Sequence, residues 1–177
     1  EVCFMSQLIG SIASSGPVVD PRIADKIILR TTAPLPDVIS CALYDVFRAV
    51  ADQLEKENRI IGSLPVHCFF LGEESFTISL DSPERAICFR LAIYPLPNLA
   101  PLIGTDFLYT VLAEELCHLI WDISDEALVN FKVLEVLRNL HPQLSLADLY
   151  SESSVEESVQ YAHRHPELPL SDLLPSD

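Results

Sequence analysis

Glycine and basic residues are both scarce in this chain. Only five glycines stand against 13 prolines among 177 residues, and no glycine-rich phosphate-binding fingerprint occurs. Eleven Lys and Arg residues are outnumbered by 26 Asp and Glu residues, which gives a net charge of −15. Because phosphate contacts need clustered Lys and Arg, the composition argues against nucleic acid as a partner. The same negative charge permits a basic protein partner.

Cysteine pairs and long apolar runs are also missing. The five cysteines are scattered and odd in number, without a C-x-x-C pair, which favours a reducing compartment over a disulfide framework. The most apolar long segment, 86–104, is interrupted by prolines, so we expect no membrane span. The N-terminus lacks the basic region and apolar run of a signal peptide. We therefore expect an intracellular, cytoplasmic protein.

Apolar residues are plentiful, and their spacing predicts an α+β domain. They make up 49% of the chain, enough for a hydrophobic core at this length. Apolar positions recur at helical spacing from Val38 to about Asn58, with Asp37 as the expected N-cap. Runs of β-branched and aromatic residues predict a short strand at 26–30 and further strands at 65–71, 76–80 and 85–94. The last three are joined by short links, so we expect a three-stranded antiparallel sheet.

Two more helices and an acidic extension complete the predicted order. One helix begins at Thr105 or Asp106 and ends near Trp121, and the next follows Ser124 as N-cap and ends near Asn139. Residues 141–177 carry seven acidic residues and one arginine, with short helices predicted at the capping-box sequences 145–148 and 154–157. The predicted organisation is an N-terminal arm or short strand (1–34), an α+β core (35–140) and an acidic C-terminal extension (141–177).

The helix that ends near Trp121 gathers ionisable side chains. Glu114 and His118 are four residues apart and therefore share one face, with Glu115 beside them. The leucines that should face the core on the opposite side are Leu108, Leu112, Leu116 and Leu119. This arrangement can bring two metal ligands and a base into one cleft. The simpler interpretation is a solvated helix face, on which the Glu114–His118 pair contributes roughly 0.2–0.5 kcal/mol.

The segment Glu114-Glu115-Leu116-Cys117-His118 resembles the H-E-x-x-H motif of the zincin metallopeptidases. The predicted order over residues 36–139 is a helix, a short antiparallel sheet, the motif helix and a further helix. That order is similar to the minimal zincin domains. The resemblance implies that Glu115 is the general base and His118 the second zinc ligand, while Glu114 occupies the position of the first histidine.

The resemblance also implies a downstream acidic ligand. Glu126 fits this role, with Asp122 and Asp125 as competitors. A carboxylate in place of the first histidine adds negative charge and alters the pKa of the neighbouring base. We therefore expect zinc or another divalent ion as the cofactor of a metallopeptidase-like protein, acting on peptide or protein, with an altered or lapsed catalytic site. The alternative is a non-catalytic acidic protein that binds a basic protein partner.

Other histidines offer further metal-binding hypotheses. The Glu115-x-x-His118 pair alone matches half of a di-iron carboxylate signature, but no second copy occurs in the chain. His163 and His165 lie close together in an expected extended tail and could share a metal ion. His67 lies in an apolar strand, where we expect a partly buried side chain rather than a ligand.

Overall fold

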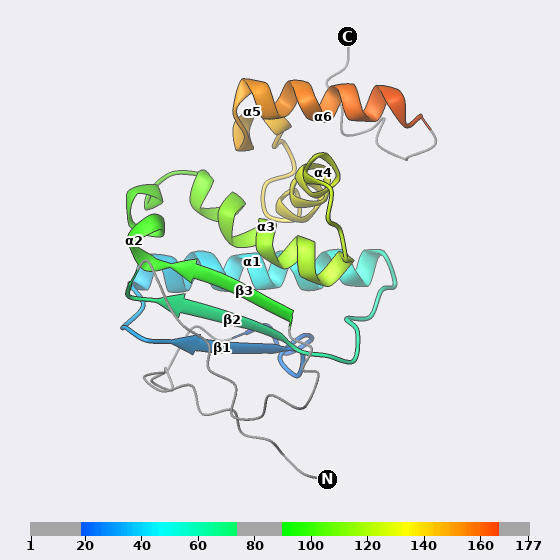
Figure 1. Ribbon diagram of the computed structural model, residues 1–177. Coiled ribbons are helices and arrows are strands. Elements are labelled where there is room, and N and C mark those ends of the chain that lie inside the picture. Colours follow the sequence, from blue (N-terminus) through cyan, green and yellow to red (C-terminus); the bar gives the residue numbers. More distant parts are fainter. Residues whose placement is uncertain (1–18, 74–89, 167–177) are drawn as a thin grey trace, which may run out of the picture.

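In the part of the chain that the structure describes, three strands form a sheet at the base of the fold (Figure 1). The computed structural model describes residues 19–73 and 90–166. The strands are β1 (Ile27–Thr31), β2 (Val66–Leu71) and β3 (Arg90–Pro95), in the spatial order β1-β2-β3. The helices of this part of the chain are α1 (Asp37–Lys56), α2 (Leu96–Leu99), α3 (Phe107–Trp121), α4 (Glu126–Leu137), α5 (Leu146–Leu149) and α6 (Glu152–Arg164), with a 3-10 turn η1 (Ala100–Leu102).

The antiparallel sheet predicted from the sequence is wrong, because both strand pairs are parallel. Ile27 pairs with Val66, and Val66 pairs with Arg90. Parallel neighbours need a crossover connection of a dozen or more residues. β1 reaches β2 through α1, and β2 reaches β3 through residues 72–89, so both connections are long enough. The predicted strand at 76–80 and the first part of the one at 85–94 lie outside the described residues.

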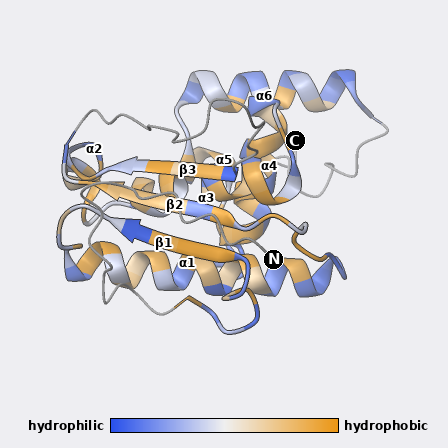
Figure 2. Cartoon of the chain, turned by 60° about the horizontal axis from the view of Figure 1, so that its bottom comes forward, coloured by the Kyte–Doolittle hydropathy of each residue, from blue (hydrophilic) through white to orange (hydrophobic). Residues whose placement is uncertain are grey.

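The helices stack in layers on one side of the sheet (Figure 1). α1 and α3 lie nearest the sheet, α4 packs against both, and α5 and α6 form the outer layer. The strands are largely hydrophobic along their length, whereas α6 is mostly hydrophilic (Figure 2). None of the described helices is long and apolar enough to cross a membrane.

The position of α3 is fixed by its contact with β3. The buried Tyr94 hydroxyl of β3 donates a hydrogen bond to the backbone carbonyl of Leu112, with an O···O distance of 3.0 Å. Phe70 of β2 stacks on the Tyr94 ring at a centroid distance of 4.8 Å. Leu108, Leu112 and Leu116 are buried as predicted, whereas Leu119 is only partly buried. One face of α3 is therefore held against the sheet, and the opposite face is left for other contacts.

Two helix starts differ from the predicted ones. Asp37 is the first residue of α1 and not its N-cap, which is Pro36. The N-cap of α4 is Asp125 and not Ser124, because the Asp125 side chain accepts a hydrogen bond from the Leu128 N–H. A cap that moves by one residue leaves the helix itself in its predicted place.

The outer helices show one correct and one wrong capping prediction. Ser145 and Asp148 form the predicted capping box at the start of α5. The box predicted at 154–157 is wrong, because α6 begins earlier, with Ser151 as its N-cap. The Ser151 hydroxyl accepts a hydrogen bond from the Ser154 N–H, so Ser154 is already helical.

A charged cluster joins α1, α3 and α4. Lys132 of α4 forms ion pairs with Glu57, at 2.7 Å, and with Glu135. Glu57, at the end of α1, also accepts hydrogen bonds from the Trp121 indole at 2.6 Å and the Gln53 amide at 2.7 Å. Burial alone raises the pKa of Glu57, but these three donors outweigh it and hold the pKa below its usual range. We call these five residues the Glu57–Lys132 cluster.

Candidate metal centre

A left-handed turn at the end of α3 shapes the candidate site. Asp122 follows the last residue of α3 with φ 58° and ψ 43°. The N–H groups of Asp122 and Ile123 both bond to the backbone carbonyl of His118. A left-handed residue commonly ends a helix in this way, although glycine is the usual choice. The turn reverses the chain, so that Glu126 at the start of α4 comes back beside His118.

His118 is held in an orientation suited to metal binding. Its Nδ1 lies 2.7 Å from the backbone carbonyl oxygen of Ile123. A carbonyl oxygen only accepts hydrogen bonds, so Nδ1 of the neutral imidazole carries the proton and Nε2 keeps its lone pair. Nε2 faces the Glu126 carboxylate at 3.7 Å. Metal-binding histidines generally donate their second ring N–H to such a carbonyl or carboxylate, which fixes the ring for its ligand.

Glu114 completes a group of three candidate ligands. One ligand atom each from Glu114, His118 and Glu126 lies within 4.8 Å of the others. Glu114 is half-buried, and its carboxylate receives no hydrogen bond from any residue that the structure describes. Burial raises the pKa of Glu114, and the Glu126 carboxylate raises it further, while His118 opposes the shift. The group therefore combines two carboxylates and one imidazole, and no lysine or arginine of residues 19–73 or 90–166 forms an ion pair with it.

The other predicted site residues lie outside this group. Glu115, the expected general base, is exposed on α3 next to Glu114. Asp122 is exposed and ends α3, so it does not continue the helical stripe of Glu114 and His118. Asp125 caps α4 with its side chain. Of the three acidic candidates after His118, the structure brings Glu126 to the histidine.

No role was predicted from the sequence for Tyr150, whose pKa is affected by two carboxylates of the group. Its hydroxyl oxygen is buried and has no hydrogen-bond partner in the described part of the chain. Burial raises the pKa of Tyr150, and the Glu114 and Glu126 carboxylates raise it further, which marks them as its electrostatic neighbours. No local pattern in the sequence signals this electrostatic effect, because Tyr150 follows α5, far from α3 along the chain.

The remaining histidines do not form comparable sites. His163 is exposed near the end of α6, and the His165 ring stacks on Tyr161 at a centroid distance of 4.4 Å. Within residues 19–73 and 90–166, neither belongs to a group of three side chains that could hold a metal ion. His67 is half-buried in β2, as predicted, and its pKa is lowered by burial and by the nearby Arg30.

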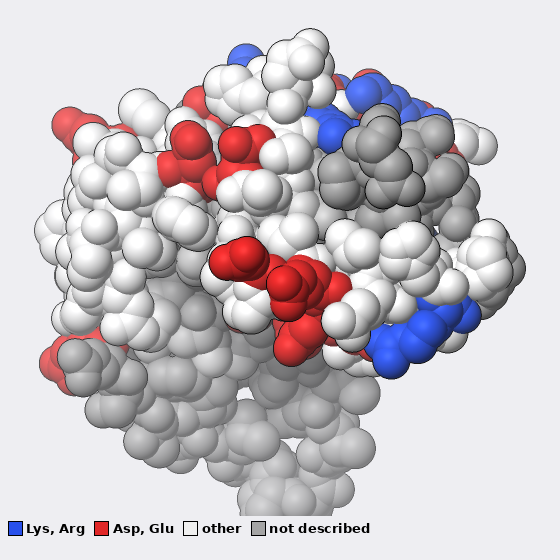
Figure 3. Space-filling model, turned by 90° about the horizontal axis from the view of Figure 1, so that it is seen from above, with Lys and Arg blue, Asp and Glu red and all other residues white. Residues whose placement is uncertain are grey.

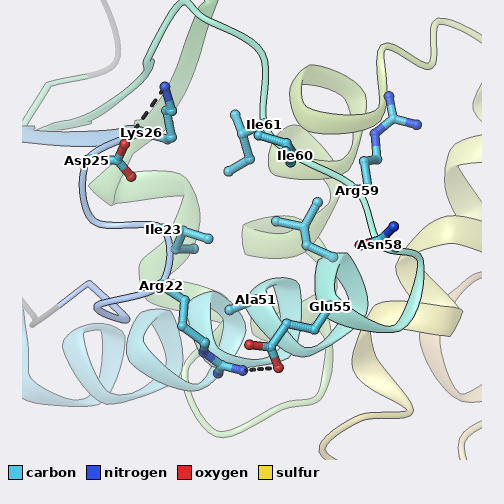
Figure 4. Close-up of a pocket in the computed structure, with 11 residues that line it drawn as sticks. Arg22, Ile23, Asp25, Lys26, Ala51, Glu55, Asn58, Arg59, Ile60 and Ile61 are labelled. Atoms are coloured by element: carbon cyan, nitrogen blue, oxygen red, sulfur yellow. Dashed lines mark hydrogen bonds and ion pairs between the residues drawn. The ribbon is translucent and has the colours of Figure 1, made fainter.

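A cavity of about 390 Å³ lies away from these groups, between the turn before β1 and the end of α1 (Figure 4). Its charged side chains already have partners. Arg22 pairs with Asp20, Asp52 and Glu55, as Figure 4 shows for Glu55. Lys26 lies 3.8 Å from Asp25, and Arg59 donates to the Trp121 carbonyl. The cavity therefore presents no unpaired charge that would identify a ligand.

Comparisons with known proteins add no assignment. No protein family, curated protein or solved structure matches this chain. The similarity to zincins therefore stays a prediction, and the chemistry of the site rests on its own residues.

Proposed function

We propose that this protein binds one divalent metal ion through Glu114, His118 and Glu126. The observation that carries the proposal is the clustering of their three ligand atoms within 4.8 Å. The bond from His118 Nδ1 to the Ile123 carbonyl supports it, because that bond presents Nε2 as a ligand. The parallel sheet differs from the antiparallel one that the zincin resemblance implied, so the proposal depends on the site and not on the fold.

The donor set favours an ion that accepts oxygen ligands. Two carboxylates and one imidazole suit Mn²⁺ or Zn²⁺ better than soft ions, which prefer thiolates. Tetrahedral zinc, with ligand distances of about 2.0–2.2 Å, holds its ligand atoms roughly 3.4 Å apart. The three atoms are spread over as much as 4.8 Å, so they must move closer together around zinc. The Glu126 side chain is 74% exposed and is free to make this movement.

We further propose that peptide hydrolysis is weak or absent. An ion held by three protein ligands can keep a position for water, as hydrolytic centres do. Glu115 is the adjacent carboxylate that could accept a proton there. However, Glu114 replaces a neutral imidazole with a carboxylate, which lowers the net positive charge available to acidify water. A metal-binding protein with a lapsed hydrolytic site is the function that this donor set supports best.

Calorimetric titration with Zn²⁺ and with Mn²⁺ tests the proposal. We expect the unaltered chain to bind one ion, and the Glu114→Ala and His118→Ala variants to lose binding by more than tenfold. Glu115→Gln should bind normally, because Glu115 is not assigned as a ligand. Glu152→Ala on exposed α6 is the matched control for the loss of one negative charge. Equal binding by the unaltered chain and both ligand variants would contradict the proposal.

A peptide-cleavage assay on the metal-loaded protein tests the second part. Little or no turnover of a mixed peptide pool is expected. Turnover that disappears in Glu115→Gln, while metal binding persists, would show an active hydrolase with a glutamate ligand.

A second candidate function, binding of a basic protein, is favoured by the acidic outer surface. α6 exposes Glu152, Glu156 and Glu157. The face seen from above, where α6 lies, carries acidic side chains in several groups (Figure 3). Titration with a lysine-rich peptide at low and high salt tests this candidate, because electrostatic binding weakens with salt. Binding that persists after all three glutamates are changed to glutamine would count against it.

A further inference from the structure

Trp121, the only tryptophan of the chain, ends α3 and is held at three points. Its indole N–H donates a hydrogen bond to the Glu57 carboxylate, with an N···O distance of 2.6 Å. The Lys132 ammonium lies 5.5 Å from the centre of its ring, within the range of a cation–π contact. Its backbone carbonyl accepts a hydrogen bond of 3.3 Å from Arg59. The buried Trp121 side chain therefore joins the end of α1, the end of α3 and α4.

Trp121 stands directly before the turn that brings the metal ligands together. It is followed by Asp122, whose left-handed conformation ends the helix. The carbonyl of His118, which precedes Trp121 on α3, accepts the N–H groups of both Asp122 and Ile123. The Ile123 carbonyl in turn lies 2.7 Å from His118 Nδ1. A shift of Trp121 would therefore disturb the hydrogen bonds that orient the His118 ring and that direct the chain toward Glu126.

The Lys132 side chain holds the other half of the metal centre. Lys132 lies on α4, the helix that begins with Glu126. It pairs with Glu57 at 2.7 Å and lies near the Trp121 ring, so α4 is joined to α1 and α3 at one place. α3 carries two of the proposed ligands, and α4 carries the third. The relative position of the two helices, and with it the separation of their ligands, is therefore fixed in part by the contacts of Glu57.

We propose that Glu57 and Trp121 form a clamp that positions the metal centre, so that the affinity for a divalent ion depends on their hydrogen bond. This inference rests on the proposed metal-binding function. Both are positioning residues, because neither is a ligand and each acts through the turn between α3 and α4. Loss of a residue that orients metal ligands typically costs about 10–100-fold in affinity. The clamp acts one step further from the ligands, so we expect a loss of about tenfold, the lower end of this range.

The coupling between the clamp and the ion is reciprocal. If the clamped fold binds the ion about tenfold more tightly, the bound ion makes opening of the clamp about tenfold rarer. Opening exposes the indole N–H of Trp121 to water, and the exchange of this proton with solvent measures how often the clamp opens. Because the chain has one tryptophan, the proton gives a single indole signal in NMR. Saturating Zn²⁺ should therefore slow its exchange about tenfold in the unaltered chain.

Calorimetry with Zn²⁺ on full-chain variants tests the clamp. Trp121→Phe keeps an aromatic ring without the donor, and Glu57→Ala removes the acceptor, so both should bind about tenfold more weakly. Glu135→Ala is the matched control, because it also loses a carboxylate that pairs with Lys132, whereas the indole donates to Glu57. This control should bind like the unaltered chain. Glu57→Gln keeps an oxygen that accepts the indole proton and should restore most of the affinity.

The outcomes separate this inference from the proposed function. Affinities of Trp121→Phe and Glu57→Ala equal to that of the unaltered chain would overturn the clamp, while the metal site would stand. An equal loss in Glu135→Ala would also overturn it, because the charge of the cluster and not the indole bond would then set the affinity. If a variant fails to fold, the indole exchange of the unaltered chain decides, and an exchange rate that bound Zn²⁺ leaves unchanged contradicts the clamp. Absence of Zn²⁺ binding by the unaltered chain would instead refute the proposed function.

Discussion

Two groups of charged residues near α3 and α4 differ in how their carboxylates are neutralised. In the Glu57–Lys132 cluster, one lysine lies between two carboxylates, and an indole and an amide complete the hydrogen bonds of Glu57. At Glu114, His118 and Glu126, two carboxylates face one imidazole without a lysine or arginine partner in the described part of the chain.

The pKa values of the two glutamates shift in opposite directions for this reason. The pKa of Glu57 is lowered because its donors outweigh the effect of burial. The pKa of Glu114 is raised because burial and the Glu126 charge act without such donors. The first cluster is completed by a cation of the protein itself. The second has no such cation among the described residues, and a divalent ion is the complement that fits its chemistry.

Removing the cation from the first cluster should have the largest effect. Lys132→Met leaves Glu57 and Glu135 without their ion pair in a partly buried site. Loss of one partner from a fully buried pair costs about 3–5 kcal/mol, and partial exposure reduces this to about 2–3 kcal/mol here. Denaturant unfolding measures the loss. Lys26→Met is the control, because its contact with Asp25 is long and exposed, and it should change stability by less than about 0.5 kcal/mol.

Neutralising one carboxylate in each group should change stability in opposite directions. Glu57→Gln should destabilise the metal-free protein by about 1–2 kcal/mol, because it removes charge-assisted hydrogen bonds. Glu114→Gln should stabilise it by about 1 kcal/mol or less, because it removes an uncompensated, half-buried charge. Denaturant unfolding of both variants at neutral pH provides the comparison. A loss of stability in Glu114→Gln would contradict the contrast between the groups.

Acid should weaken the Glu57–Lys132 cluster in a defined pH range. Since the folded-state pKa of Glu57 is depressed, its contribution to stability is present above the unfolded-state value of about 4.3 and is lost as the pH falls through the lower folded-state value. Stability should therefore decline below about pH 4. Unfolding curves between pH 2 and 6 should show a shallower decline for Glu57→Gln. Identical pH profiles would mean that Glu57 does not contribute this stability.

The smallest effect is expected at the turn that joins the two halves of the metal site. Asp122 has a positive φ, a region that glycine adopts readily and that costs most other residues about 1 kcal/mol or more. Asp122→Gly should stay within about 0.5 kcal/mol of the unaltered chain, whereas Asp122→Ala should lose about 1 kcal/mol. Thermal melting of the two variants measures the difference. Equal stabilities would show that the left-handed conformation carries no cost.

Local features of the fold could be predicted from the sequence, and non-local ones could not. The strand near 26–30, the end of α3 at Trp121 and the capping box at Ser145 depend on neighbouring residues, and all three predictions are confirmed. The predicted antiparallel direction of the strands is wrong, because both strand pairs are parallel. Strand direction depends on the long connections between the strands, which are α1 and residues 72–89, and not on neighbouring residues.

The residues of the candidate site also divide into those that local spacing predicts and those that it does not. The pairing of Glu114 with His118 could be predicted, because residues four apart on a helix lie on the same face. The choice of Glu126 over Asp122 and Asp125 depends on the left-handed turn at Asp122, which the sequence does not signal because the usual glycine is absent there. The effect of Glu114 and Glu126 on the pKa of Tyr150 is likewise non-local, because Tyr150 follows α5 and is distant from both residues along the chain.

Anomalous X-ray diffraction from crystals soaked in Zn²⁺ or Mn²⁺ tests the central claim most directly. We predict one strong anomalous peak about 2.0–2.2 Å from His118 Nε2 and from a carboxylate oxygen of each of Glu114 and Glu126. The Glu57–Lys132 cluster should carry no peak, because Lys132 already neutralises it. A fully soaked crystal without a peak at the three ligands, or with its strongest peak at His163 and His165, would contradict the account.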